Sequence, residues 1–257
     1  MRIALVQMLV EGGKPEQNLD RASCRIEEAA NNGAQLVLLP EALDLGWTHS
    51  SASRLASPVP EGAPFRQLAS AAVSQGVHVC AGLVERDGEQ LFNSAVLIGP
   101  DGKPLIRHRK INELEIALDL YTPGDTVAPV CETELGRIGL EICADGFAEN
   151  QWISRELCSQ GAELILAPSA WAVEANFDPA KPPYGAIWRE NFGPVARECS
   201  VWIVACSNVG QIEEGPWRGR KCIGNSLAFD PNGNEVLTGP FGEDADTILY
   251  LDVEIRK

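Results

Sequence analysis

Apolar runs no longer than one β-strand recur from end to end of this chain, and turn residues separate them. Residues 34–40 (AQLVLLP) are apolar on both faces, which is typical of a strand buried in the middle of a sheet. The stretches that begin at Pro15 and span residues 64–75 instead repeat their apolar residues at helical spacing. Gly33 and Gly76 follow them as helix-ending glycines. Strands and helices therefore alternate in this part of the chain.

Hairpin signals interrupt this alternation. The dipeptide Asp87-Gly88 separates residues 77–85 from 91–99, and the turn sequence PDGK leads into 104–110, which predicts antiparallel pairing. Further strands are predicted at residues 136–142, 163–167, 201–207, 223–229 and 247–254, and helices at 149–160 and 184–199. This mixture predicts an α/β (α+β layered) fold of mixed sheets covered by helices. Since no linker or repeat interrupts the pattern, we expect a single domain over residues 1–257.

The formal net charge of −15 limits the partners of this chain. An acidic surface repels phosphate backbones and anionic lipids, so we expect no nucleic-acid and no membrane partner. The opening sequence MRIALVQM lacks the features of a signal peptide, and no apolar run approaches the roughly 20 residues of a spanning helix. These features predict a cytoplasmic location.

The chain has eight cysteines and three histidines, but neither residue type is spaced as metal ligands are. We therefore expect no metal and no organic cofactor. Most of the cysteines are expected to be reduced thiols that pack as small apolar side chains.

One polar residue that breaks the apolar pattern is Glu41, which follows the buried run in LVLLPEAL. Removing a carboxylate from water favours its neutral form, and this makes it a better proton acceptor. Taken alone, Glu41 is explained as well by a glutamate at the start of a helix, where the helix dipole stabilises it.

A second such residue is Lys110, which ends the strand in PLIRHRKINELE. A lysine held by a carboxylate stays charged and can stabilise a developing oxyanion. Glu113 and Glu115 follow closely and are both candidates for that carboxylate. Taken alone, Lys110 is explained as well by an exposed ion pair.

The third residue is Cys143 in GLEICADGF, where a strand stops and a polar turn begins. A thiol at such a turn can be accessible while its strand stays buried, and it becomes a nucleophile when a base or a cation lies beside it. The alternative is one more buried structural cysteine among eight.

Taken together, the stretches LPEAL, HRKIN and GLEICAD resemble the nitrilase superfamily of carbon–nitrogen hydrolases, whose members use a glutamate, a lysine and a cysteine in that order. Other landmarks match over essentially the whole chain: RIALVQ, FNSAVLIGPDG, YTPGD, LILAPSAW, CSNVG and GNSLAFDPNG. The resemblance implies a four-layer α-β-β-α sandwich of two mixed sheets, a homodimer or higher homo-oligomer, and catalysis by Glu41, Lys110 and Cys143. It also implies a second glutamate that orients Lys110, for which Glu115 is preferred and Glu113 is the alternative.

This chain departs from the family pattern after the nucleophile. Ala144 follows Cys143 where amidase-type members often have tyrosine, and ADGFAE has no arginine to anchor the loop. The Trp-Glu pair that is common in nitrile-cleaving members is also absent. Because Asp145 is retained, a small amide is favoured over a nitrile as the substrate.

The resulting hypothesis is a cofactor-independent hydrolase that forms a thioester on Cys143, with Glu41 as the base. Lys110 and the backbone N–H of Ala144 would bind the oxyanion. Trp171 and Phe147 are candidate substrate contacts, and further aromatic candidates are Trp47, Tyr184 and Trp188. The alternatives are a nitrilase and a catalytically idle family member that acts as an interaction protein. A cysteine protease or acyltransferase of the Cys-His type is disfavoured because His49, His78 and His108 form no pattern that points to Cys143.

Overall fold

The computed structural model describes residues 1–178 and 184–255. Its first sheet contains the first and the last strand of the chain. The sheet has six strands in the order β15-β1-β2-β3-β4-β5. The strands are β1 (Arg2–Gln7), β2 (Leu36–Leu38), β3 (His78–Asp87), β4 (Gln90–Ile98), β5 (Pro104–Arg109) and β15 (Thr247–Asp252). The pairs β1–β2 and β2–β3 are parallel, whereas β3–β4, β4–β5 and β1–β15 are antiparallel, so the sheet is mixed.

The second sheet is also mixed and has the order β14-β13-β10-β8-β7-β6. Its strands are β6 (Cys131–Thr133), β7 (Gly136–Leu140), β8 (Leu164–Ser169), β10 (Trp202–Ser207), β13 (Leu227–Phe229) and β14 (Glu235–Thr238). A small third sheet joins β9 (Ala172–Val173), β11 (Val209–Gln211) and β12 (Lys221–Ile223).

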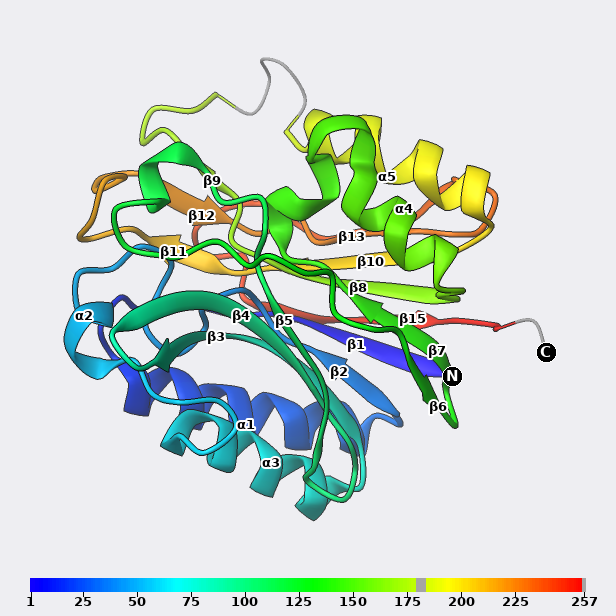
Figure 1. Ribbon diagram of the computed structural model, residues 1–257, viewed down its shortest axis with the longest axis horizontal. Helices are drawn as coiled ribbons and strands as arrows, with labels where there is room; N and C mark the ends of the chain where they lie inside the picture. Colours follow the sequence, from blue (N-terminus) through cyan, green and yellow to red (C-terminus); the bar gives the residue numbers. More distant parts are fainter. Residues whose placement is uncertain (179–183, 256–257) are drawn as a thin grey trace.

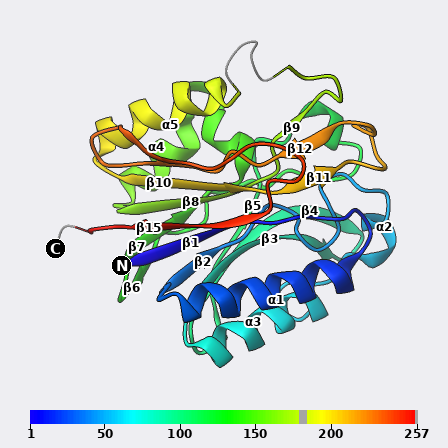
Figure 2. The ribbon, with the colours of Figure 1, turned by 180° about the vertical axis from the view of Figure 1, so that it is seen from behind.

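Helices cover the outer face of each large sheet, so that the molecule has four layers (Figures 1 and 2). The helices α1 (Pro15–Asn31) and α3 (Ala63–Gln75) lie against the first sheet, and α4 (Trp152–Ser159) and α5 (Ala186–Cys199) lie against the second. A short helix, α2 (Ala52–Leu55), lies at one edge. The predicted α-β-β-α sandwich is confirmed.

The alternation of side chains in β1 explains why the sheets stack. Ile3 and Leu5 pack into the core between the two sheets, whereas Ala4 and Val6 pack into the core under α1 and α3. Successive side chains of a strand point to opposite faces, so an apolar strand can serve two cores.

The structure corrects two of the predicted elements. Residues 149–160 do not form one helix. Asn150 and Gln151, in the 3₁₀ turn Glu149–Gln151, have φ values of 55° and 49°, so the α-helix α4 begins only at Trp152. Trp152, the first residue of α4, is 46% exposed. The strand predicted at 223–229 is likewise divided, because Gly224 and the next residue have left-handed backbones.

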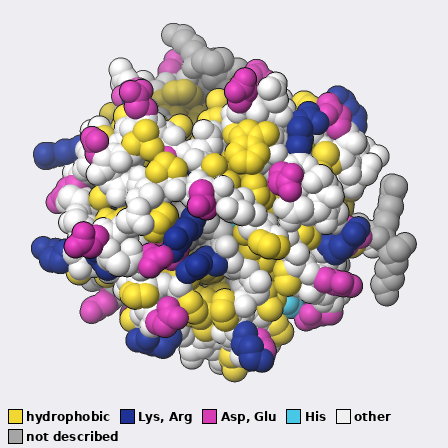
Figure 3. Space-filling model, viewed as in Figure 1, with side chains coloured by type: hydrophobic (Ala, Val, Ile, Leu, Met, Phe, Trp, Pro, Cys, Tyr) yellow, Lys and Arg dark blue, Asp and Glu magenta, His cyan; other side chains and the backbone are white. Residues whose placement is uncertain are grey.

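Charged side chains of both signs are interspersed over the face seen in Figure 3. Within residues 1–178 and 184–255, no helix is long and apolar enough to cross a membrane.

Candidate functional site

Glu41 lies just beyond β2, in the space between the two large sheets. Its backbone N–H donates to the carbonyl of Ser169 at the end of β8, at 3.2 Å. On the other side, β3 approaches so closely that a Cβ on Gly82 would lie 2.5 Å from the Glu41 Cα. Glycine at that position therefore allows the approach, and the Glu41 residue is only 1% exposed.

Two donors converge on one oxygen of the Glu41 carboxylate. Lys110 Nζ lies 2.7 Å from Glu41 Oε1, and Asn93 Nδ2, from β4, lies 2.6 Å from the same atom. The other carboxylate oxygen is not needed for either contact. The arrangement therefore fixes the direction in which the carboxylate points.

Lys110 follows β5, and its backbone is held on both sides. Its N–H donates to the Asn93 carbonyl at 2.8 Å, and its carbonyl accepts from the Gly124 N–H at 2.7 Å. A Cβ on Gly124 would lie 2.3 Å from the carbonyl oxygen of Arg109, so this contact requires glycine. Burial opposes the charge on the ammonium, but Glu41 and Glu113 outweigh burial and hold the pKa of Lys110 well above its usual value.

The second carboxylate beside Lys110 is Glu113, and the preference for Glu115 is corrected on this point. Glu113 Oε2 lies 3.7 Å from Lys110 Nζ, and the Glu113 side chain is fully buried. Glu115 begins a 3₁₀ turn and is exposed to solvent. Burial raises the pKa of Glu113 to about 7, although Lys110 acts in the opposite direction.

Cys143 begins the 3₁₀-helix η2 (Cys143–Phe147), three residues beyond the end of β7. Its φ of 45° is unusual for a residue with a side chain, and it turns the chain sharply out of the sheet. The residue is 8% exposed. Burial, followed by the charge of Glu41, raises the pKa of the thiol, while Lys110 and a hydrogen bond from the Ala170 backbone oppose that rise. Burial and the charge of Glu41 therefore both favour the neutral thiol over the thiolate.

Asp145 anchors the turn that carries Cys143. One oxygen of its carboxylate accepts from the N–H groups of Ile111 and Asn112 at 3.0 and 2.8 Å. The other accepts from the Ile142 N–H at 3.0 Å and lies 2.9 Å from His108 Nε2. The departure noted in ADGFAE is thus explained: hydrogen bonds to a buried aspartate hold this loop without an arginine.

The proton on His108 is placed by a neighbouring backbone group. The Ala128 N–H points to His108 Nδ1 at 3.5 Å, so Nδ1 is the acceptor. The ring proton is therefore on Nε2, which donates a hydrogen bond to the Asp145 carboxylate. Asp145 and His108 are both fully buried. Although burial opposes ionisation, the hydrogen bond from His108 helps to hold the pKa of Asp145 below its usual value.

Glu41, Lys110 and Cys143 all line one pocket of about 240 Å³. The remaining lining is largely apolar and comes from several separate segments: Trp47, Leu114, Phe147, Ala170, Trp171, Ala172, Ile187, Trp188 and Trp217. The sequence-derived candidates Trp171 and Phe147 therefore lie in the pocket. Ala144 is fully buried beneath it, and its carbonyl accepts a hydrogen bond from Asn112 Nδ2 at 2.6 Å.

Aromatic pairs form two parts of this lining. The ring centroids of Trp171 and Trp188 lie 4.2 Å apart, and Phe147 meets Trp188 edge-on at 6.0 Å. Trp47 and Trp217 also meet edge-on, at 4.9 Å. Because each ring is supported by another, the pocket is largely formed in advance of binding.

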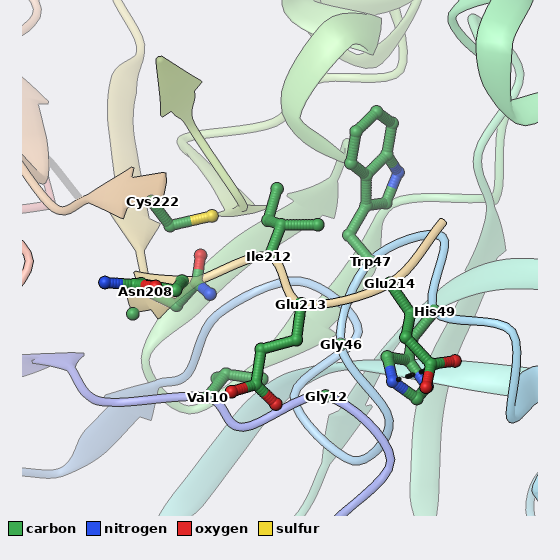
Figure 4. A pocket seen from close by; sticks show the side chains of 12 residues that line it. Val10, Gly12, Gly46, Trp47, His49, Asn208, Ile212, Glu213, Glu214 and Cys222 are labelled. Atoms are coloured by element: carbon green, nitrogen blue, oxygen red, sulfur yellow. Dashed lines mark ion pairs between the residues drawn. The ribbon is translucent and has the colours of Figure 1, made fainter. Parts of the chain in front are cut away.

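A second pocket of about 20 Å³ adjoins the first and shares Trp47 with it (Figure 4). Trp47 points away from His49 and Glu214, which lie together at the other side of this space. Glu214 Oε2 accepts from the Ser50 hydroxyl and lies 3.6 Å from His49 Nε2. The segment that carries Trp217 is thereby tied to the segment that carries Trp47.

Comparison with known proteins identifies the family. The sequence profile of the carbon–nitrogen hydrolases matches residues 2–256. The chain belongs to the carbon–nitrogen hydrolase family. A nitrilase of Pyrococcus abyssi is 34% identical to this carbon–nitrogen hydrolase over 241 residues, 93% of this chain and 84% of the relative. An omega-amidase of Xenopus tropicalis is 34% identical over 272 residues, 99% of this chain and 89% of the relative.

Solved structures of the same superfamily share the fold of this hydrolase. An amidase of Nesterenkonia sp. AN1 has a TM-score of 0.81 and 25% identity, covering 99% of this chain and 93% of its own. A carbon–nitrogen hydrolase of Helicobacter pylori G27 has a TM-score of 0.86 at 20% identity, covering 97% and 87%, and is evidence for the fold alone. The membership of the nitrilase superfamily inferred from sequence motifs is confirmed, and the chain is an enzyme of the hydrolase class.

Sequence reasoning missed several residues of this hydrolase site. Asn93 was detectable, since it is a polar residue inside the buried run LFNSAVLIG. His108 was assigned only to a strand, and nothing in its sequence neighbourhood indicates Asp145 as its partner. Trp217 lies in a polar loop far from the motifs, and only the folded chain brings it to the pocket.

Proposed function

We propose that this carbon–nitrogen hydrolase cleaves small amides to a carboxylic acid and ammonia through a thioester on Cys143. The observation that carries the proposal is the shared pocket, which Glu41, Lys110 and Cys143 all line and in which the Glu41 carboxylate is bound to Lys110 at 2.7 Å. A base, a cation and a nucleophile in one pocket are the parts that acyl transfer requires.

In the first half of the proposed reaction, Glu41 takes the proton from Cys143 Sγ as the sulfur attacks the amide carbon. A C–S bond forms, and the electron pair of the carbonyl π bond moves onto oxygen. The Lys110 ammonium and the Ala144 N–H stabilise that oxyanion. The carbonyl then re-forms, the C–N bond breaks, and Glu41 returns the proton to the departing nitrogen.

In the second half, Glu41 removes a proton from water, which attacks the thioester carbon. The C–S bond breaks as the carbonyl re-forms, the acid leaves, and the proton held by Glu41 restores the thiol of Cys143. Glu113 is the residue that we propose to orient Lys110, since it is the second carboxylate at the ammonium. Phe147 and Trp171 contact the acyl group from the wall of the pocket.

Ammonia release from a panel of small amides tests the reaction, with Cys143→Ala and Cys24→Ala compared with the wild type. Cys24 is an exposed cysteine on α1, so its loss should leave turnover unchanged. Cys143→Ala should release no ammonia, and mass spectrometry of quenched wild-type enzyme should detect an acyl adduct on Cys143. Turnover by Cys143→Ala would refute the nucleophile. No turnover of any amide or nitrile by the wild type would favour an idle member.

Nitrile hydrolysis is the second candidate function, because a relative at 34% identity is named a nitrilase. An amide needs stabilisation of an oxyanion, whereas a nitrile first gives a thioimidate and needs stabilisation at nitrogen. The rates kcat/KM of pentanamide and pentanenitrile, which share one acyl group, separate the two. A consistently faster nitrile would overturn the amide assignment while leaving the roles of Glu41, Lys110 and Cys143 intact.

The homodimer or higher oligomer inferred from the family resemblance also stays a prediction. Light scattering coupled to gel filtration should give a mass of at least twice the monomer, and a monomer at micromolar concentration would contradict it.

A further inference from the structure

The acyl end of the pocket is lined by apolar and aromatic side chains. Beyond Glu41, Lys110 and Cys143, the described lining is made of Trp47, Leu114, Phe147, Ala170, Trp171, Ala172, Ile187, Trp188 and Trp217. Four of these are tryptophans, whose faces and edges offer a large apolar area to a ligand. The pocket of about 240 Å³ lies below the range of about 300–1,000 Å³ typical of sites for drug-sized ligands, so the substrate is small.

Among the described residues, three positive charges in or near the pocket have carboxylate partners. Among the described lining residues, Lys110 is the one cation, and Glu41 and Glu113 both lie against its ammonium. Arg220 lies near Trp217, with its guanidinium 4.0 Å from that ring, and it forms an ion pair with Glu174 at 2.5 Å.

Arg189, on the first turns of α5 near Trp188, is also occupied. Its side chain forms an ion pair with Glu235 at 2.6 Å and donates to the Tyr184 carbonyl at 2.5 Å. Neither arginine belongs to the lining described above. A substrate carboxylate bound against the described apolar lining would therefore lose its water without gaining a counter-ion from that lining, and this is unfavourable.

We propose that the hydrolase selects amides whose acyl group is uncharged and apolar, either alkyl or aryl, and excludes amides that carry a second, ionised carboxylate. This inference rests on the proposed amidase function and specifies its substrate class. The net charge of −15 acts in the same direction, since it lowers the concentration of anions near the pocket. The supported tryptophan pairs favour the apolar acyl group because little side-chain freedom is lost on binding.

A matched substrate pair tests the selection. Pentanamide and 5-amino-5-oxopentanoate have the same chain length and differ in a terminal methyl against a carboxylate. The wild type should use pentanamide with a kcat/KM about 10²-fold higher, because the carboxylate would be buried without a partner. 3-Phenylpropanamide should also be a good substrate. Equal or better use of the carboxylate substrate would overturn the inference, whereas hydrolysis of none of the three would instead refute the proposed function.

A charge-introducing variant tests the cause of the selection. Ile187 is 42% exposed and lines the pocket, so arginine can be accommodated there with its head group near solvent. Ile187→Arg should raise kcat/KM for the carboxylate relative to pentanamide by about tenfold or more. Val73→Arg is the matched control, since Val73 is 53% exposed on α3 and lies on the opposite outer face of the sandwich.

Val73→Arg adds the same charge and should leave the ratio of the two rates unchanged. A ratio that moves equally in both variants would assign the effect to overall charge and contradict the role of the pocket. A ratio that moves in neither variant, with folding verified by circular dichroism, would also count against the inference. The wild-type comparison stands even if Ile187→Arg does not fold.

Discussion

At the scale of single residues, two of the unusual backbone conformations lie at the site. Cys143 has a φ of 45°, and Ala42, next to Glu41, has a φ of 47°. Such conformations cost of order 1–3 kcal/mol each and persist where the surrounding structure holds them. Here the cost places a carboxylate and a thiol in one pocket between the sheets, with Lys110 beside the carboxylate.

Glu41→Gln should abolish most of the activity while keeping the fold. Glutamine has a similar shape and can still accept from Asn93, but it cannot take a proton from Cys143. We expect kcat to fall by about 10²–10⁴, as is common when a general base is removed. Single-turnover kinetics with pentanamide measure this, and circular dichroism controls for folding. A variant with near wild-type turnover would exclude Glu41 as the base.

Glu113→Gln and Glu115→Gln are a matched pair that tests which glutamate orients Lys110. Glu113 is buried beside the ammonium, so its replacement should lower kcat by about tenfold or more, with a smaller change in KM. Glu115 is exposed, and its replacement should change neither parameter appreciably. The reverse result would restore Glu115 to the role inferred from the family resemblance.

At the scale of elements, the site depends on how the 3₁₀-helix η2 is held against β5 and the segment after it. Asp145 in η2 accepts hydrogen bonds from His108 in β5 and from the backbone N–H groups of Ile111 and Ile142. These contacts join the turn that carries Cys143, in the second sheet, to the strand that precedes Lys110, in the first. The relative position of the two reactive groups is therefore set between sheets.

Asp145→Asn should weaken the contact between η2 and β5. An amide nitrogen in place of one oxygen would face the donors of Ile142 and His108, so these hydrogen bonds would be lost. We expect the free energy of unfolding to fall by about 3–6 kcal/mol, since two hydrogen bonds to a charged group are lost and each contributes about 1.5–3 kcal/mol. The midpoint of thermal unfolding and the separate kcat and KM values measure it, and kcat should fall more than KM changes.

His108→Gln is the control for that variant, because glutamine can still donate to Asp145. It should retain more stability and more activity than Asp145→Asn. Wild-type stability and kcat in Asp145→Asn would show that the hydrogen bonds of Asp145 do not position Cys143.

At the scale of the whole molecule, both sheets contribute to one core. Leu5 and Leu38 of the first sheet belong to the same cluster as Leu140 and Ile165 of the second. Separating the sheets would expose this cluster to water, which is strongly unfavourable. The layers are therefore expected to unfold together, as one cooperative unit.

The expectation of a single domain can be tested by denaturant unfolding followed with two probes. Tryptophan fluorescence and far-ultraviolet circular dichroism should give coincident transitions, as one cooperative unit requires. Two separated transitions would divide the chain into independent domains.

Stability should fall as the pH rises from about 5 to 8. Burial raises the pKa of Asp44 and Glu113 to about 7 and that of Glu141 to about 8, from ordinary values of 3.8 for aspartate and 4.5 for glutamate. Between the ordinary and the raised pKa values, the folded chain keeps protons that the unfolded chain has lost. The stabilising contribution of these three groups is therefore fully present below about pH 4 and is lost as the pH rises to their folded pKa values. Asp145, whose pKa is lowered, destabilises the fold only in acid.

Glu141→Gln should therefore show a shallower fall in the thermal midpoint between pH 5 and 9 than the wild type. Glu141 is buried beside Ser154, whose hydroxyl donates to it at 2.5 Å. Glu89→Gln, at an exposed turn, is the matched control and should follow the wild-type curve. Identical curves for Glu141→Gln and the wild type would contradict the burial effect.

Local pattern in the sequence was sufficient for most of the elements and for three of the reactive groups. Apolar spacing predicted the main strands and helices, because the periods of strand and helix are properties of the local chain. The motifs LPEAL, HRKIN and GLEICAD indicated Glu41, Lys110 and Cys143, which the structure brings to one pocket. Left-handed residues such as Asn150 were not visible in that pattern, since their conformation is imposed by packing.

Only the tertiary structure decided the contacts between distant segments. The position of Glu113, rather than Glu115, beside Lys110 is visible only in the folded chain. The pairing of His108 with Asp145 joins residues 37 positions apart that no sequence spacing relates. The apolar pocket is likewise assembled from separate loops, including the one that carries Trp217. Side chains meet across such distances because the two sheets stack, and stacking is a property of the whole chain.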